Sequence, residues 1–171
     1  MSQLGLPYGI VTVVDHDPSW LLTGSAYAAD VAALLGELTD GVEHIGSTSV
    51  SGLAAKPVID LAIRQGPAVP FDPVRDALTG AGYIYRGDAG QDGGQVFVAE
   101  PEPWVRTVHL HVVAAGDPQW PRYLAVRDRL RADPEAVARY GALKRDLAVQ
   151  YADDRRAYTR AKTDFLRDLL R

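Results

Sequence analysis

Residues 42–63, which read VEHIGSTSVSGLAAKPVIDLAI, decide the fold. Residues 42–45 and 57–63 are expected to be strands, and the second has the continuous apolar character of a buried strand. Between them, the Gly46-Ser47 turn lets backbone N–H groups approach a phosphate closely. Asp60 follows Gly46 by fourteen residues and is the one acid on the second strand, where it can hold a metal ion that bridges phosphate oxygens. The stretch therefore predicts a phosphate-binding turn beside a metal-binding strand.

The same stretch resembles a known family. It is similar, almost letter for letter, to the hallmark EHIGSTSVPGLAAKPIIDI of the GrpB-like family of the nucleotidyltransferase superfamily, with Ser51 where proline is usual. The resemblance covers nearly the whole chain and implies a nucleotidyltransferase-like mixed sheet with flanking helices. It also implies similarity to a domain fused to some dephospho-CoA kinases. The other residues that carry it are the runs VHLHV (108–112) and VRDRLR (126–131), with Tyr140, Lys144, Tyr158 and Lys162.

Composition predicts one domain over residues 1–171, with a sheet-bearing body over 1–116 and basic helices over 117–171. Residues 1–121 contain five basic and fourteen acidic side chains, whereas residues 122–171 contain thirteen and eight. The net charge of −4 argues against nucleic acid as a partner. The absence of cysteine excludes disulfides and thiolate zinc sites. With no apolar run of membrane length and no signal pattern, we expect a cytoplasmic protein without a membrane partner.

Capping residues and periodicity predict an α/β (α+β) order of elements. A helix is expected from Ser19, as its cap, to Gly36, and another over 72–81, capped by Asp72. Extended segments are expected over 10–14, 83–86, 95–99 and 105–113. The glycine-rich residues 87–94 between two of these strands form a loop, read either as a lid or as an ordinary mobile loop. A three-helix C-terminal set is expected, with starts at Asp117, Asp133 and Asp153 or Asp154.

Two groups of cations suggest an anionic ligand. Lys56, Lys144 and Lys162 are the only lysines among eighteen basic residues, which suits positions where a compact point charge is needed. Arg127 and Arg131 lie one helical turn apart and are expected to grip one anion together. The basic C-terminal helices either place such cations beside a ligand held by the body, or are ordinary solvated faces that pair with it.

Histidines form a second pattern. His109 and His111 alternate along one strand, so both point to the same face, where they either bind a metal or phosphate or stand as hydrogen-bonded polar residues. The resemblance favours the ligand role, because related enzymes carry their third acid on this strand. His44 is expected to shape the Gly-Ser turn by hydrogen bonding.

The acid at Asp60 stands alone, and this leaves the function open. Related transferases carry an acid pair that holds two metals, but here Ala62 occupies the second position. One divalent ion, Mg²⁺ or similar, held by Asp60 with His109 or His111 would support nucleotidyl or phosphoryl transfer on a nucleotide or another phosphorylated small molecule. The alternatives are a non-catalytic module that binds a nucleotide or CoA-type ligand, and an accessory protein that docks through its basic helices. The residues expected to meet in one cleft are Gly46, Ser47, Thr48, Lys56, Asp60, His109, His111, Arg127, Arg131, Lys144 and Lys162.

Overall fold

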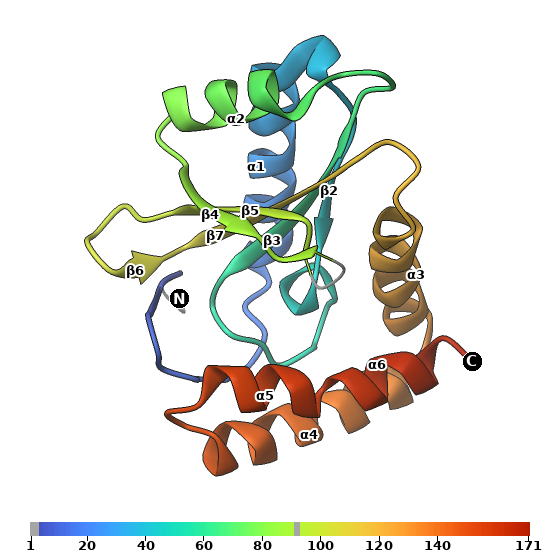
Figure 1. Ribbon diagram of the computed structural model, residues 1–171. Helices are drawn as coiled ribbons and strands as arrows, with labels where there is room; N and C mark the ends of the chain where they lie inside the picture. The colour runs from blue at the N-terminus through green and yellow to red at the C-terminus, as the bar shows by residue number, and fades with distance from the viewer. Residues whose placement is uncertain (1–3, 91–92) are drawn as a thin grey trace.

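A five-stranded mixed sheet forms the centre of the computed structural model, which describes residues 4–90 and 93–171 (Figure 1). Its strand order is β2-β3-β7-β5-β4. Strands β3 and β7 run parallel, and the other neighbouring pairs run antiparallel. The strands are β2 (Thr39–Ile45), β3 (Ile59–Gln65), β4 (Ile84–Asp88), β5 (Gln95–Ala99) and β7 (Val108–Val113). The expected nucleotidyltransferase-like mixed sheet is confirmed.

One face of the sheet is covered by α1 (Ser19–Leu35) and α2 (Phe71–Gly80) (Figure 1). Alternation along β3 sends Ile59, Leu61 and Ile63 to this face, where all three are fully buried in the main core. Trp20 of α1 and Leu78 of α2 pack into the same core. Burying this apolar face leaves the opposite face of β3 and β7 free to carry polar groups.

The opposite face is partly covered by α3 (Gln119–Ala132). Trp120 at its start packs against Ile45 of β2, Ala62 of β3 and Val113 of β7. Ala62 is completely buried there, so the position of a second acid is taken up by core packing. The polar side chains of β3 and β7 that lie beyond this contact open toward the C-terminal helices.

The C-terminal helices form a layer across one end of the sheet (Figure 1). They are α4 (Pro134–Gln150), α5 (Arg155–Ala161) and α6 (Thr163–Leu169). Tyr140 of α4 stacks on Phe165 of α6 with ring centroids 4.7 Å apart, and it packs with Val50 and Leu53 of the body. The last of the three expected C-terminal helices is thus divided at Lys162 into α5 and α6.

The extended segments near the N-terminus differ from expectation. Leu6–Pro7 (β1) pairs with Val105–Arg106 (β6) in a separate two-stranded ribbon. Of the expected segment over 10–14, Val14 makes a single bridge, to Ala55. The expected strand over 105–113 is interrupted at Thr107 between β6 and β7.

Helix starts show which capping predictions hold. Asp133 and Asp154 accept hydrogen bonds from backbone N–H groups in the first turns of α4 and α5, as expected. Asp117 accepts one from the Gln119 amide. Ser19 does not cap α1: the Asp17 carboxylate accepts the bond from the Ser19 amide, because the turn before the helix already places an acid there. Asp72 lies inside α2 and makes no cap.

The stretch Ser19–Leu38 is long and apolar enough to pass a test of length and composition for a membrane span, with a mean hydropathy of 1.2. The expectation that no apolar run reaches membrane length does not hold for this stretch. It comprises α1 and the 3₁₀ turn Gly36–Leu38, and its residues Trp20, Val31 and Leu35 pack on the sheet. A core helix meets the same test.

Candidate functional site

The Gly46 turn lies directly over Asp60. Gly46 has φ 70° and ψ −173°, a backbone conformation that is essentially confined to glycine. A Cβ atom at this position would lie 2.9 Å from Asp60 Oδ2. The following residues form the 3₁₀ turn Ser47–Ser49, closed by hydrogen bonds from the Ser49 amide and hydroxyl to the Gly46 carbonyl. Glycine is therefore needed both for the turn and for its approach to the acid.

His44 braces this turn from beneath, as expected. Its Nε2 lies 3.0 Å from the Thr48 hydroxyl. Helix α1 packs so closely above the ring that a Cβ at Gly24 would lie 2.2 Å from His44 Nδ1. Burial, together with the nearby Arg131 and Arg127 charges, lowers the pKa of His44 to about 4. His44 is thus a neutral structural residue at physiological pH.

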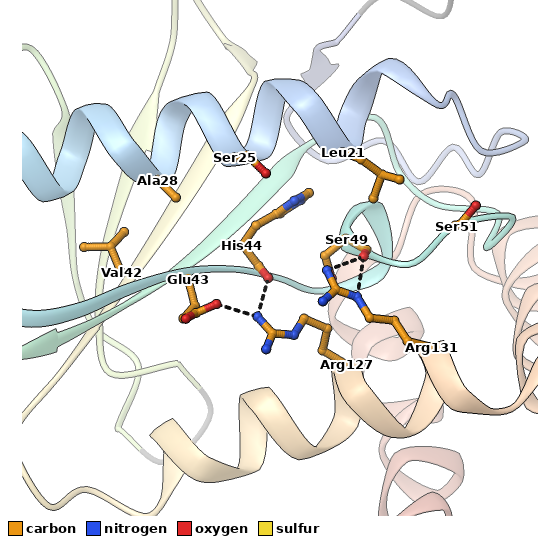
Figure 2. Close-up of a pocket in the computed structure, with 10 residues that line it drawn as sticks. All are labelled: Leu21, Ser25, Ala28, Val42, Glu43, His44, Ser49, Ser51, Arg127 and Arg131. Atoms are coloured by element: carbon orange, nitrogen blue, oxygen red, sulfur yellow. Dashed lines mark hydrogen bonds and ion pairs between the residues drawn. The ribbon is translucent and has the colours of Figure 1, made fainter.

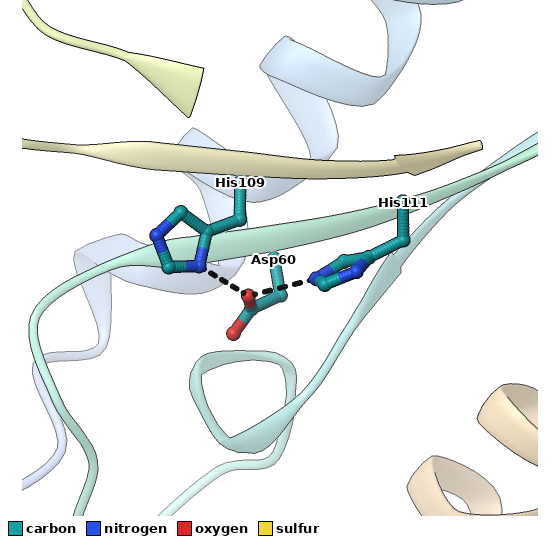
Figure 3. A group of neighbouring side chains, drawn as sticks. All are labelled: Asp60, His109 and His111. Atoms are coloured by element: carbon teal, nitrogen blue, oxygen red, sulfur yellow. Dashed lines mark hydrogen bonds and ion pairs between the residues drawn. The ribbon is translucent and has the colours of Figure 1, made fainter. Parts of the chain in front are cut away.

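Asp60 and the two histidines form a compact trio on β3 and β7 (Figure 3). Asp60 Oδ1 lies 3.2 Å from His109 Nδ1 and 3.4 Å from His111 Nε2. Burial opposes ionisation of Asp60, but the hydrogen bonds with His109 and His111 outweigh it and hold the Asp60 pKa well below its usual range. Burial lowers the pKa of His109 despite the neighbouring carboxylate. The trio thus presents an ionised carboxylate and two imidazoles to one point.

The same three residues are the group that could hold a metal ion. One ligand atom from each lies within 4.8 Å of the other two. The parallel register produces this arrangement, because Asp60 pairs with His109 and Ala62 pairs with His111 across β3 and β7. Ala62, at the position of a second acid in related transferases, is fully buried and adds no ligand.

A cleft of about 440 Å³ opens from the trio toward the C-terminal helices. Among the described residues that line it, Asp60 is the one acid. Seven basic residues line it: Lys56, Arg122, Arg127, Lys144, Arg155, Arg160 and Lys162. Such a preponderance of positive charge, at the edge of a body that is otherwise acidic, favours an anionic ligand.

Lys144 connects α4 to the turn. Its ammonium group donates hydrogen bonds to the Ser47 hydroxyl, at 2.8 Å, and to the Ala54 carbonyl. It also lies 4.5 Å from the centre of the Tyr140 ring. Burial, with the charges of Lys162 and Lys56, lowers the pKa of Lys144. Lys144 therefore positions the turn.

Lys56 and Lys162 flank the buried ring of Tyr158, at 5.7 Å and 4.6 Å from its centre. Burial and the charge of Lys162 lower the pKa of Lys56 to about 7. Burial, with the charge of Arg155 and against the attraction of Asp60, lowers the pKa of Lys162 to about 8. These amines meet aromatic rather than carboxylate partners, so their charges are left to a ligand.

Ten of the eleven predicted site residues line this cleft, and Arg131 does not. Arg131 donates to the Ser49 carbonyl at 2.8 and 3.0 Å and lines a separate groove of about 600 Å³ between α1 and α3 (Figure 2). Arg127 lines both cavities and is held by Glu43 at 2.6 Å and by the His44 carbonyl at 3.2 Å. Arg131 therefore lies outside the expected cleft. Both guanidinium groups line the groove and bind backbone beside the turn, so their expected joint grip on one anion stays a prediction.

Sequence reasoning missed several residues of the cleft. Arg122, Arg155 and Arg160 add charge, and Gln119 and Tyr123 form its wall beside the histidines. Gln119 and Tyr123 are four residues apart on α3, and their side chains are hydrogen-bonded at 3.2 Å. That helical spacing was the available signal, since it places both on the face that Trp120 turns toward the sheet.

The glycine-rich loop after β4 touches the site at two points. The Gln119 side chain donates to the Gly90 carbonyl at 2.9 Å, and His111 Nδ1 lies 3.2 Å from the Gly93 carbonyl oxygen. Residues 91–92 of the expected lid or mobile loop lie outside the described residues. The described part of the loop thus borders the histidines of the trio.

Comparison with known proteins identifies the relatives of this chain. The family model described as GrpB protein matches residues 10–171. The chain belongs to the GrpB family. The crystal structure of the conserved protein GrpB from Enterococcus faecalis matches with a TM-score of 0.81 and 32% identity, covering 93% of this chain and 94% of that one.

Sequence relatives agree with this assignment. The glutamate-rich protein GrpB of Alkalihalophilus pseudofirmus is 29% identical over 98% of both chains. A UPF0157 protein of Streptomyces coelicolor is 38% identical over 89% of this chain and 78% of its own length. A dephospho-CoA kinase of Mycobacterium leprae is 28% identical, but this GrpB chain spans only 48% of its length. The predicted family resemblance is confirmed.

Proposed function

We propose that the cleft of this GrpB protein binds a nucleotide or another phosphorylated small molecule. The observation that carries the proposal is the convergence of Lys56, Lys144 and Lys162 on the cleft that the Gly46-Ser47 turn also lines, with Lys144 bonded to the turn. Lys144 is buried and Lys56 and Lys162 are half-buried, all three have lowered pKa values, and a phosphate placed among them would favour their charged forms. The turn would add backbone N–H groups to the same anion.

Metal-assisted nucleotidyl or phosphoryl transfer is the activity we propose for this site. The trio of Asp60, His109 and His111 would hold one divalent ion beside the phosphate, where it would supply Lewis-acid stabilisation. The side chains then have separate tasks: Lys56 and Lys162 would bind and orient the phosphate, and Lys144 would keep the turn in place.

A second candidate is a binding module without turnover. It is favoured by Ala62, which is buried under Trp120 and removes the second acid that a two-metal mechanism uses. The likeness to dephospho-CoA kinases makes CoA-type compounds reasonable ligands for such a module.

A binding panel tests both candidates. Nucleoside mono-, di- and triphosphates, CoA, dephospho-CoA and pyrophosphate would be titrated calorimetrically with and without a chelator, with adenosine and pantetheine as unphosphorylated controls. We expect phosphorylated compounds alone to bind, with an affinity that falls as salt is raised.

Two variants locate the binding in the cleft. Lys56→Ala should weaken affinity for the best phosphorylated ligand by about ten- to a hundredfold, because a charged hydrogen bond to a ligand contributes roughly 1.5–3 kcal/mol. Arg75→Ala is the matched control, since Arg75 pairs with Asp72 and Asp76 on α2, away from the cleft. Equal weakening by both variants, or no binding by any phosphorylated compound, would refute the proposal. Binding that persists unchanged in chelator, without turnover, would favour the module.

A further inference from the structure

The histidines give the trio a donor set that magnesium does not favour. Mg²⁺ takes oxygen ligands in octahedral geometry, usually from carboxylates, phosphates and water. The trio offers one carboxylate and two imidazole nitrogens, and Asp60 is the one acid among the described residues that line the cleft. Imidazole nitrogen suits iron, nickel, copper and zinc, and two histidines with one carboxylate commonly bind a transition metal with open positions.

We propose that Asp60, His109 and His111 bind one first-row transition-metal ion, such as Mn²⁺, Fe²⁺, Co²⁺, Ni²⁺ or Zn²⁺, in preference to Mg²⁺. This deepens the proposed function by naming the class of metal at the same site. It narrows the expected divalent ion, Mg²⁺ or similar, to one class of metal.

The distances within the trio fit such an ion. Two ligand atoms that each lie about 2.1 Å from one metal are about 3.0 Å apart at a right angle and about 3.4 Å apart at the tetrahedral angle. Asp60 Oδ1 lies 3.2 Å from His109 Nδ1 and 3.4 Å from His111 Nε2 (Figure 3). An ion can therefore be bound between Asp60 and each histidine, and the ligand atoms of the trio, all within 4.8 Å of one another, would close around it through side-chain adjustment.

The hydrogen bonding of His111 supplies an independent argument. Its Nδ1 faces the Gly93 carbonyl at 3.2 Å, and its Nε2 faces the Asp60 carboxylate at 3.4 Å. Both partners are acceptors, and a neutral imidazole has one N–H to donate. If Nδ1–H is donated to Gly93, Nε2 presents a lone pair toward Asp60, which is the arrangement of a metal-binding histidine held by a backbone carbonyl. In this tautomer a metal ion between Nε2 and Asp60 would bind both the lone pair and the carboxylate.

The lysines of the cleft set a condition on this site. Lys162, and Lys56 where it is protonated, oppose a second cation near Asp60. An anionic ligand between the lysines and the ion removes this opposition, so metal and phosphate should bind cooperatively. The metal site is nevertheless testable without any phosphorylated compound.

The test uses tag-free protein that has been stripped with a chelator and then dialysed free of it. Co²⁺ and Mn²⁺ are titrated at pH 7.5 by visible absorption and electron paramagnetic resonance, and Ni²⁺, Zn²⁺ and Mg²⁺ by calorimetry. We expect one equivalent of each transition metal to bind at least about 100-fold more tightly than Mg²⁺. Pulsed electron paramagnetic resonance of Co²⁺ or Mn²⁺ bound to the wild-type protein should detect coupling to imidazole nitrogen.

Variants then assign the ligands. His111→Gln and His109→Gln should each weaken Co²⁺ binding at least about tenfold. His16→Gln is the matched control, because His16 contacts Trp20 rather than the trio. Mg²⁺ binding as tight as Co²⁺, or bound ions without nitrogen coupling, would overturn the proposal. Because these measurements contain no phosphate, their failure leaves the phosphate-binding panel to decide the proposed function separately.

Discussion

The three lysines allow a direct test of the cleft's electrostatics by pH titration. Their side-chain resonances can be observed together in ¹³C-lysine-labelled protein and assigned with single Lys→Arg variants. Burial, with the charge of Lys162 on Lys56 and of Arg155 on Lys162, predicts titration midpoints of about 7 for Lys56 and about 8 for Lys162 in the ligand-free protein, against 10.5 for a free lysine. Sulfate, which does not titrate in this range, should raise both midpoints.

The same titration predicts how stability depends on pH. Between pH 7 and 10.5 the unfolded chain carries a proton on Lys56 that the folded protein does not, so the free energy of unfolding increases with pH. For Lys56 alone the slope is about 1.4 kcal/mol per pH unit. In a domain of this size that corresponds to a rise in melting temperature of roughly 3–6 °C from pH 8 to 9.

Thermal unfolding at pH 8 and 9 checks this magnitude. Lys56→Met should remove the share of the rise that comes from Lys56, whereas Arg75→Met should leave it intact. Lysine midpoints near 10.5, or a melting temperature that falls from pH 8 to 9 in the wild-type protein, would show that the amines are solvated and that the reasoning is wrong.

Three further substitutions test individual contacts. Gly46→Ala should lower the unfolding free energy by about 1–3 kcal/mol through backbone strain alone, and further through its clash with Asp60. Gly52→Ala, at a positive φ in open space, should lower it less, and scanning calorimetry of both variants would measure the difference. Ala62→Asp should destabilise the protein by more than about 3 kcal/mol without raising Mg²⁺ affinity, which chemical denaturation and metal titration would measure, because the new carboxylate would be buried in the core. Arg131→Ala should lower stability by about 1.5–3 kcal/mol through the lost bonds to Ser49 but leave pyrophosphate affinity unchanged.

The parts of the site that the sequence predicts are those fixed by local geometry. Gly46 and Asp60 lie at the ends of neighbouring strands, so the turn between them returns the chain to the sheet beside itself. His109 and His111 share a face because strand side chains alternate. Strand pairing then needs only the register of β3 against β7 to complete the trio.

Errors arise where a side chain's direction depends on how a helix packs. Arg127 and Arg131 are four residues apart, so their directions differ by about 40° around the helix axis. Because α3 lies between the cleft and the groove, that rotation leaves Arg127 at the border of both cavities and Arg131 in the groove alone. The break at Lys162 and the roles of Arg155 and Arg160 likewise depend on how α5 and α6 lie across the sheet, which local patterns do not specify.

Lys144 and Lys162 belong to the helices that close the cleft, whereas Lys56 belongs to the body. Their repulsion therefore acts across the seam between these two parts and opposes the packing of Tyr140 against Leu53. An anion in the cleft reverses the sign of this force and joins the two parts. A bound anion should therefore stabilise the packing of the C-terminal helices on the body. Amides of α4 to α6 should exchange with deuterium faster in the empty protein and more slowly once an anion is bound.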